Sequence, residues 1–283
     1  MSEKLEKIFN DFISDVNDKQ GVYYADGGNN ENVPYFSNRE GSCVFSEAIL
    51  KKLGKKNFFK YTEYSLSSLY MSDDTISLEE DVNFETFINI ITKASDVNNK
   101  YKWVDYYFKF DVKEEFNILT PRSENKDFLF RKYLEPNHLK NMSVLRKYEQ
   151  GAILKTSEKN KVDTKIVSEY IVHDTYKNII ESLDYQLSHK IYTKAHIFHS
   201  KYGNSDHIII LVMRHYKDEN FLHPLFHDRA LVQIKSYSNY NKYSDITQKN
   251  LLNYAEIFKP YISLRKVDNN FVEQIKDSLS RTF

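Results

Sequence analysis

The sequence predicts an α+β fold: a largely antiparallel β cylinder or barrel with a few packed helices and a more helical N-terminal region. The chain has 22 Tyr and 19 Phe but only 7 Gly and 5 Pro, and aromatic residues favour strands over helices. Between Tyr101 and Val112, apolar residues such as Val104 and Phe108 alternate with polar ones, which is typical of a half-buried strand. His207–Tyr216 is a nearly continuous apolar run, typical of a buried strand.

Residues 1–100 are expected to form a helical N-terminal region whose role the sequence does not define. Residues 3–16 carry apolar side chains at helical spacing, and Cys43–Leu53 predicts a second helix. Ser77–Glu80 reads as a capping box, with a hydroxyl at the start and a Glu three residues later. The helix that follows is expected to turn Phe87 and Ile91 inward.

Residues 101–283 are expected to form the antiparallel cylinder, with a boundary near Val97–Lys100 and a helix at the C-terminal end. The predicted strands after the first are Asp127–Tyr133, Met142–Tyr148, Val162–Val172, Tyr185–His199, His207–Tyr216, Ala230–Ser238 and Tyr261–Val267. The predicted helices are Asp174–Leu183, Asp245–Phe258 and Asp268–Ser280, and Pro260 is expected to end the second of them.

Composition argues against several classes of function. Lys plus Arg equals Asp plus Glu at 40 each, so the basic excess of a nucleic-acid-binding protein is missing. Cys43 is the single cysteine, which rules out a disulfide within the chain and a Cys-rich zinc site. No apolar stretch approaches membrane-spanning length, the first residues lack the apolar core of a signal peptide, and no Gly-rich phosphate loop occurs. We therefore expect no membrane span, no cofactor and no small-molecule substrate.

One motif indicates possible nucleophilic chemistry. The string Glu40–Phe45, in which Cys43 begins the predicted helix Cys43–Leu53, resembles the motif of ovarian-tumour-type cysteine proteases. That resemblance implies Cys43 as nucleophile and His215, after the strand Ile208–Val212, as its base. The other interpretation is that Cys43 is a small buried apolar residue, and both stay open.

Metal chemistry finds little support in the sequence. His196 and His199 are three residues apart on a predicted strand and so face opposite ways, and His223 and His227 lack further ligands nearby. Tunnel-shaped triphosphatases hold a metal with carboxylates on strands. The predicted strands Tyr185–Ser200, His207–Tyr216, Ala230–Ser238 and Tyr261–Val267 contain no Asp or Glu, so we expect no such site and no bound metal.

The segment Asn253–Asp268, with the order Asn-Tyr-Ala-Glu, then Lys-Pro, then a short strand, resembles subunit 18 of the Mediator head module. Upstream of this segment, three further strings resemble strings of the family and occur in the same order: Lys194–Phe198, Ile208–Tyr216 and Leu231–Ile234. The resemblance covers about residues 140–268 and does not reach residues 1–100.

This resemblance implies a non-catalytic nuclear protein, a coactivator subunit that acts in transcription by RNA polymerase II through protein contacts. It further implies a β cylinder that forms a heterodimer with Mediator subunit 20 and is tethered by a helix of subunit 8. Phe258, Tyr261 and Phe271 are candidate partner-binding residues, and each of them could instead belong to the core. A binding module of unrelated ancestry would keep the same fold without this partnership.

Overall fold

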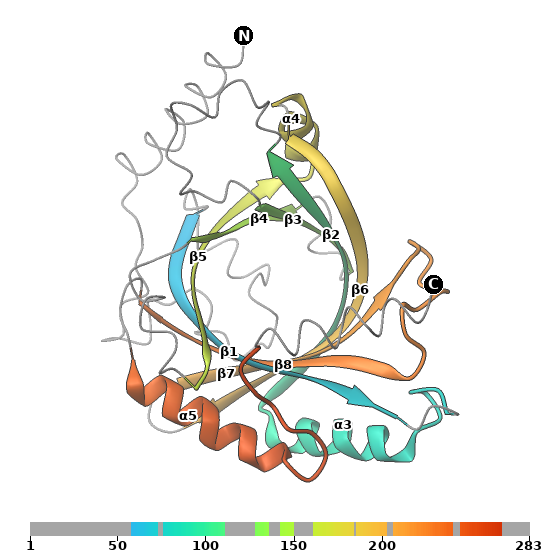
Figure 1. The fold of residues 1–283 in the computed structure, drawn as a ribbon, viewed down its shortest axis with the longest axis vertical. Helices are drawn as coiled ribbons and strands as arrows, with labels where there is room; N and C mark the ends of the chain where they lie inside the picture. The colour runs from blue at the N-terminus through green and yellow to red at the C-terminus, as the bar shows by residue number, and fades with distance from the viewer. Residues whose placement is uncertain are drawn as a thin grey trace.

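Eight antiparallel strands close into a barrel in the order β1-β5-β4-β3-β2-β6-β7-β8 (Figure 1), which confirms the predicted fold class. The computed structural model describes residues 58–72, 76–110, 128–135, 142–149, 161–183, 185–202, 206–239 and 244–267. The strands are β1 (Phe58–Met71), β2 (Val97–Phe110), β3 (Phe128–Glu135), β4 (Met142–Glu149), β5 (Asp163–His173), β6 (Tyr185–Tyr202), β7 (Asp206–Tyr216) and β8 (Arg229–Asn239). The helices are α3 (Val82–Ala94), α4 (Tyr176–Ser182) and α5 (Asp245–Ala255), the last followed by the 3-10 turn η4 (Glu256–Phe258).

Strand β1 closes the barrel, although it lies in the stretch expected to be helical. It pairs with β5 along one edge and with β8 along the other. The barrel therefore includes a strand upstream of residue 101, and β2 already begins at Val97. The predicted helices at residues 3–16, Cys43–Leu53 and Asp268–Ser280 lie outside the described residues. No helix in the described part of the chain is long and apolar enough to cross a membrane.

Helix α3 forms where expected, but its cap is Asp81 and not Ser77. The Asp81 carboxylate accepts hydrogen bonds from the backbone N–H groups of Asn83 and Phe84 at 2.8 and 3.2 Å, as an N-cap side chain does. The Ser77 carbonyl instead accepts the N–H groups of Glu80 and Asp81 in the preceding turn. The helix therefore begins one turn later than the capping box predicts.

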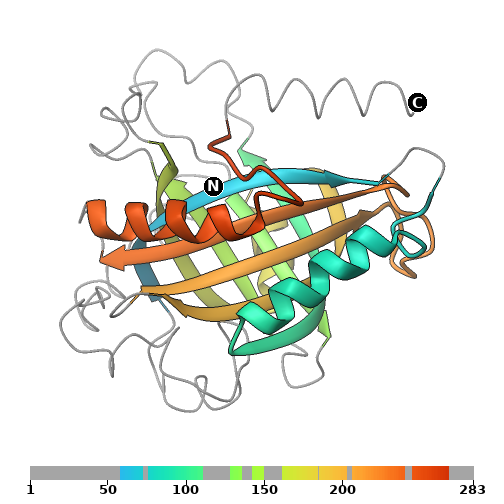
Figure 2. The same cartoon turned by 90° about the horizontal axis from the view of Figure 1, so that it is seen from below.

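An apolar core lies outside the barrel wall, beneath α3 and α5. Figure 2 shows both helices lying across the same side of the barrel. The strand side chains that face them are buried and apolar: Tyr64, Leu66, Phe198, Ile208, Ile210, Val212, Val232 and Ile234. Phe87 and Ile91 of α3 and Leu251 of α5 cover them at 0% exposure. Each such side chain contributes roughly 1.5–3 kcal/mol through burial.

The segment after α5 returns to the barrel with less strand than predicted. Within Tyr261–Val267, one antiparallel bridge forms, between Arg265 and Ser67 of β1. The pairing of β1 with β5 ends at Ser65 opposite Asp163, so Arg265 occupies the edge that β5 leaves open. The Val267 N–H donates to the Asp163 carboxylate at 2.8 Å, which fixes the segment against the start of β5.

Candidate functional site

The barrel lumen is lined by the residues that alternate with those of the outer core. Its apolar part includes Tyr61, Trp103, Tyr133 and Val167. Between these residues lie three buried ion pairs, each joining two neighbouring strands: Glu63–Lys235 (β1–β8), Asp105–Arg131 (β2–β3) and Glu169–Arg146 (β5–β4). The lumen is therefore a mixed core, in which charge pairs connect six of the eight strands.

Asp105 accepts hydrogen bonds from two side chains of the lumen. Arg131 donates to its two carboxylate oxygens from Nε and Nη2 at 2.7 and 2.8 Å, and Trp103 Nε1 donates at 3.0 Å. The Arg131 guanidinium lies 4.2 Å from the centre of the Trp103 ring. Burial lowers the pKa of Arg131, but Asp105 outweighs burial and raises it overall, so the guanidinium stays charged.

In the other two ion pairs, a buried carboxylate is likewise bonded to a basic side chain of the neighbouring strand. Lys235 Nζ lies 3.1 Å from both carboxylate oxygens of Glu63. Burial raises the pKa of Glu63, yet Lys235 and then Arg146 outweigh burial and hold the pKa below its usual value. Arg146 donates to Glu169, whose side chain is completely buried. Buried charges of this kind persist only when they are paired and hydrogen-bonded.

These lumen carboxylates correct one part of the sequence argument. The argument against a metal tunnel considered the predicted strands from Tyr185 onward, whereas Glu63, Asp105 and Glu169 come from β1, β2 and β5. Carboxylates therefore do enter the lumen, and each is bonded to Arg or Lys. The described residues contain no group of three or more His, Cys, Asp or Glu arranged to hold a metal ion.

His215 lies within this lumen network. Its Nδ1 is 3.0 Å from the Thr193 hydroxyl of the neighbouring strand, and burial lowers the pKa of its imidazole. Cys43, its predicted catalytic partner, lies outside the described residues. The described structure thus gives His215 a place in the packing of the barrel, and the protease interpretation gains no support from it.

Two of the histidines considered as metal ligands, His196 and His223, have different neighbours in the structure. His196 contacts Asn98 at 3.2 Å, and burial followed by the charge of Lys100 lowers the pKa of His196 to about 4. His223 lies 3.2 Å from the Asp218 carboxylate, and Asp218 also accepts the backbone N–H groups of Leu222 and His223. This capped loop is irregular, so His223 and His227, four residues apart, do not share one face of a helix.

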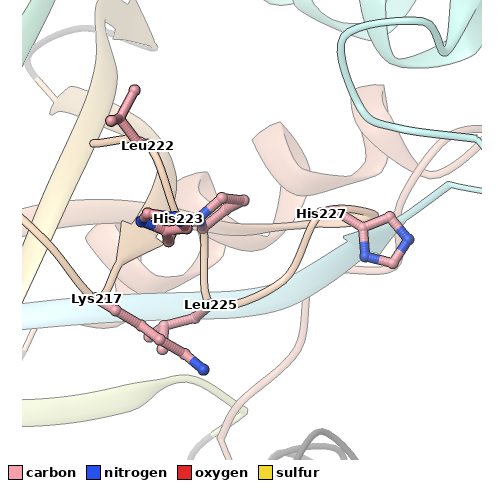
Figure 3. Close-up of a pocket in the computed structure, with 6 residues that line it drawn as sticks. Lys217, Leu222, His223, Leu225 and His227 are labelled. Atoms are coloured by element: carbon pink, nitrogen blue, oxygen red, sulfur yellow. The ribbon is translucent and has the colours of Figure 1, made fainter. Parts of the chain in front are cut away.

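The same loop, which joins β7 to β8 in the chain, borders a surface hollow of about 560 Å³. The hollow is lined by Lys217, Leu222, His223, Pro224, Leu225 and His227 (Figure 3). Phe221 of this loop has a backbone φ of 57°. Its ring packs edge-on against the rings of Tyr192 and Tyr216, and these contacts hold the loop against the barrel. The hollow is thus held by an ordered loop, and its lining includes no carboxylate.

The predicted partner-binding residues divide between the core and the surface. Phe258 is 1% exposed and lies edge-on to Phe87 and Tyr254 in the outer core. Tyr261 is 36% exposed, with its ring 6.0 Å from that of Phe87. Phe271 lies outside the described residues. Partner binding by these residues stays a prediction, and of the two described ones, Phe258 and Tyr261, the side chain of Tyr261 reaches solvent.

Two further apolar residues on the same surface were not singled out from the sequence. Ile246 of α5 and Ile257 of η4 are 73% and 45% exposed. Leu251 and Phe258 face the core. The signal was present in the sequence, because Leu251, Ala255 and Phe258 share one side of the predicted helix Asp245–Phe258, and Ile246 and Ile257 lie off that side.

Comparisons with known proteins give similar solved structures at low sequence identity. A chain of the Schizosaccharomyces pombe Mediator head module aligns with 12% identity and a TM-score of 0.49, covering 73% of this chain and 98% of that one. A Pyrococcus horikoshii OT3 protein aligns with 11% identity and a TM-score of 0.45, covering 76% and 99%. A Hippeastrum protein described as having a dominant triphosphatase activity aligns with 8% identity and a TM-score of 0.39, covering 76% and 96%. No family model matches the sequence, and no curated protein matches it closely.

Proposed function

We propose that this protein is a non-catalytic scaffold subunit of a nuclear Mediator head module, acting in transcription through protein contacts. The observation that carries the proposal is the segment resembling subunit 18, taken together with its conformation. Its helix ends at η4 ahead of Pro260, and Arg265 then bridges to β1. The order of helix, Lys-Pro and returning segment thus joins α5 to the barrel wall.

The exposed side of α5 is a suitable surface for a partner. Ile246 of α5, Ile257 of η4 and Tyr261 leave apolar area in solvent, and the other side of α5 is held in the outer core. An amphipathic helix binds such a surface by burying apolar anchors spaced along one of its faces. By the resemblance, the partners are subunit 20 as the second barrel of a heterodimer and subunit 8 as the source of the helix.

Purification from a native extract tests the proposal directly. A tagged full-length chain is expected to co-purify with other Mediator head subunits in near-equal amounts, as measured by gel filtration and mass spectrometry. A chain that purifies without any Mediator subunit would contradict the scaffold role.

A pair of variants tests the surface itself. Ile257→Asp combined with Tyr261→Asp places two charges in the proposed contact and is expected to reduce co-purification of the helix-donating subunit at least tenfold. Val82→Asp is the matched control, because Val82 is a 72% exposed apolar residue at the start of α3, where an acidic residue suits the helix dipole. Equal losses in both variants would remove α5 as the contact surface.

A further inference from the structure

Four basic side chains lie together on the outer face of the barrel wall, where β2, β6 and β7 run side by side. Lys102 of β2 is paired with Lys194 of β6, and Lys194 is paired with Arg214 of β7. Lys100 precedes Lys102 by two residues and therefore points to the same face. Tyr101, between the two, faces the lumen, which places Lys100, Lys102, Lys194 and Arg214 on the outer face. These four residues are called the basic block.

Two cations of the basic block have a carboxylate partner and two have none. Lys102 Nζ lies 2.8 Å from Glu135, and Arg214 is paired with an acidic side chain of the turn before α3. Among the residues that the structure describes, neither Lys100 nor Lys194 forms an ion pair. The basic block therefore carries two positive charges that no described carboxylate neutralises.

Neutral groups surround these two lysines. Lys194 Nζ lies 3.5 Å from the carbonyl oxygen of Phe221 and 4.8 Å from the centre of the Tyr216 ring. Lys100 is exposed and lies opposite His196, whose pKa is lowered to about 4 by burial and then by the charge of Lys100. His196 is therefore uncharged at neutral pH, and the two lysines are left as cations without a counter-charge.

The spacing of the two lysines fits carboxylates on alternate residues of an extended segment. Because Lys100 lies opposite His196, two residues from Lys194, the lysines are diagonal neighbours on adjacent strands, about 7 Å apart. In an extended chain, residues i and i+2 point to the same side and are also about 7 Å apart. Two carboxylates with this spacing can each reach one lysine, and such charge complementarity favours one partner over others.

The two acidic side chains at the basic block favour a short acidic segment over a nucleic acid. Glu135 lies beside Lys102 and Glu79 lies beside Arg214, and their side chains are 54% and 63% exposed. A nucleic acid carries a phosphate at every step and binds its proteins through roughly 6–10 phosphate contacts. Its backbone would meet both carboxylates, whereas a protein segment can place uncharged residues beside them.

We propose that the basic block binds an extended acidic segment of a partner protein, with carboxylates two residues apart contacting Lys100 and Lys194. The proposal rests on the proposed function only in taking the occupant to be a protein, and it uses β2 and β6 in place of α5. Because exposed charge pairs are screened by salt, the contact is expected to weaken as the ionic strength rises.

Carbodiimide cross-linking of the full-length chain tests this, because the reagent joins a carboxylate to a lysine amine in direct contact. Two synthetic nine-residue peptides of Ser and Thr, with blocked ends, carry two Glu each. The Glu residues are two positions apart in the first peptide and adjacent in the second. With the first peptide, mass spectrometry is expected to find at least fivefold more cross-links at Lys100 and Lys194 than at Lys249, an exposed lysine of α5. With the second peptide, this excess is expected to disappear.

Variants separate the paired contact from general attraction to lysine. Lys100→Gln removes one of the two charges at an exposed position and is expected to reduce cross-linking of the first peptide at Lys194 at least threefold. Lys249→Gln is the matched control and is expected to leave cross-linking at Lys194 unchanged.

Three outcomes would overturn the inference. The first is the absence of any excess of cross-links at Lys100 and Lys194 over Lys249 with the first peptide. The second is a single-stranded DNA that prevents these cross-links at a lower concentration than the uncoupled peptide does, which assigns the basic block to a nucleic acid. The third is cross-linking of Lys100 or Lys194 to another copy of the chain, which assigns the basic block to a dimer. None of these outcomes depends on Mediator co-purification, so failure here and failure of the proposed function are distinguishable.

Discussion

The two sides of the barrel wall are stabilised by different interactions, although the same strands build both. The outer side of β1, β6, β7 and β8 is an apolar core under α3 and α5. The lumen side is a mixture of aromatic residues and three buried ion pairs. Apolar contacts tolerate partial loss in proportion to the area removed, whereas a buried charge without its partner is strongly destabilising. The lumen is therefore the less tolerant of the two cores.

The largest expected effect comes from breaking one lumen pair. Arg131→Ala leaves Asp105 buried without its cation, which is expected to lower the free energy of unfolding by about 3–5 kcal/mol. Urea denaturation followed by fluorescence measures this, and the single tryptophan, Trp103, reports from the same network.

The double variant Arg131→Met with Asp105→Leu is the control. Replacing both charges by apolar groups is expected to recover most of the loss. A cost below about 1 kcal/mol for Arg131→Ala alone would mean that the lumen admits water and behaves as a surface.

A core truncation on the outer side sharpens the comparison. Leu251→Ala removes a fully buried side chain of α5 and is expected to cost about 2–4 kcal/mol through lost burial and the cavity that remains. Because no titrating group is involved, the cost is expected to be the same at pH 7 and pH 5. Lys249→Ala, two residues away on the exposed side, is expected to change stability by less than about 0.5 kcal/mol. A pH-dependent cost for Leu251→Ala would show that the two cores are not independent.

The smallest expected effect concerns acid stability. The pKa of Glu63 is below its unperturbed value of 4.5 in the folded chain, so its stabilising contribution is complete above about pH 4.5 and is lost as the pH falls through the folded pKa. The double variant Glu63→Gln with Lys235→Met is expected to match the unaltered chain within about 1 kcal/mol at pH 7 and to lose less stability on acidification. Equal acid sensitivity in both proteins, measured by urea denaturation at several pH values, would assign the acid loss to other groups.

The outer core was largely predictable from the sequence, and the lumen was not. The predicted helix Asp245–Phe258 corresponds to α5 and η4, because Leu251, Ala255 and Phe258 show its buried side through their spacing. The alternation in β2 was recognised, but it placed Asp105 toward solvent, whereas Asp105 is 5% exposed inside the lumen. A charged residue in an alternating strand reads as a surface residue unless its partner is known, and Arg131 lies 26 residues away.

The polar residues on the lumen side of β1 explain why this strand was not predicted. Its lumen-facing positions Glu63, Ser65 and Ser67 are polar and buried, so the strand lacks a simple apolar pattern. Exposed Ile246 and Ile257, in contrast, could be inferred from the helical spacing alone.

The closing position of β1 has a consequence for the synthesis of the chain. Glu63 and Lys235 are separated by 172 residues, and at roughly 5–20 residues per second translation takes about 9–34 s to cover that distance. During this interval β1 has left the ribosome without β8, its partner along one edge, and Glu63 lacks its cation. The barrel thus becomes complete only when the last strand has been made, and a chain that stops before Arg229 retains an unpaired edge on which aggregation can begin.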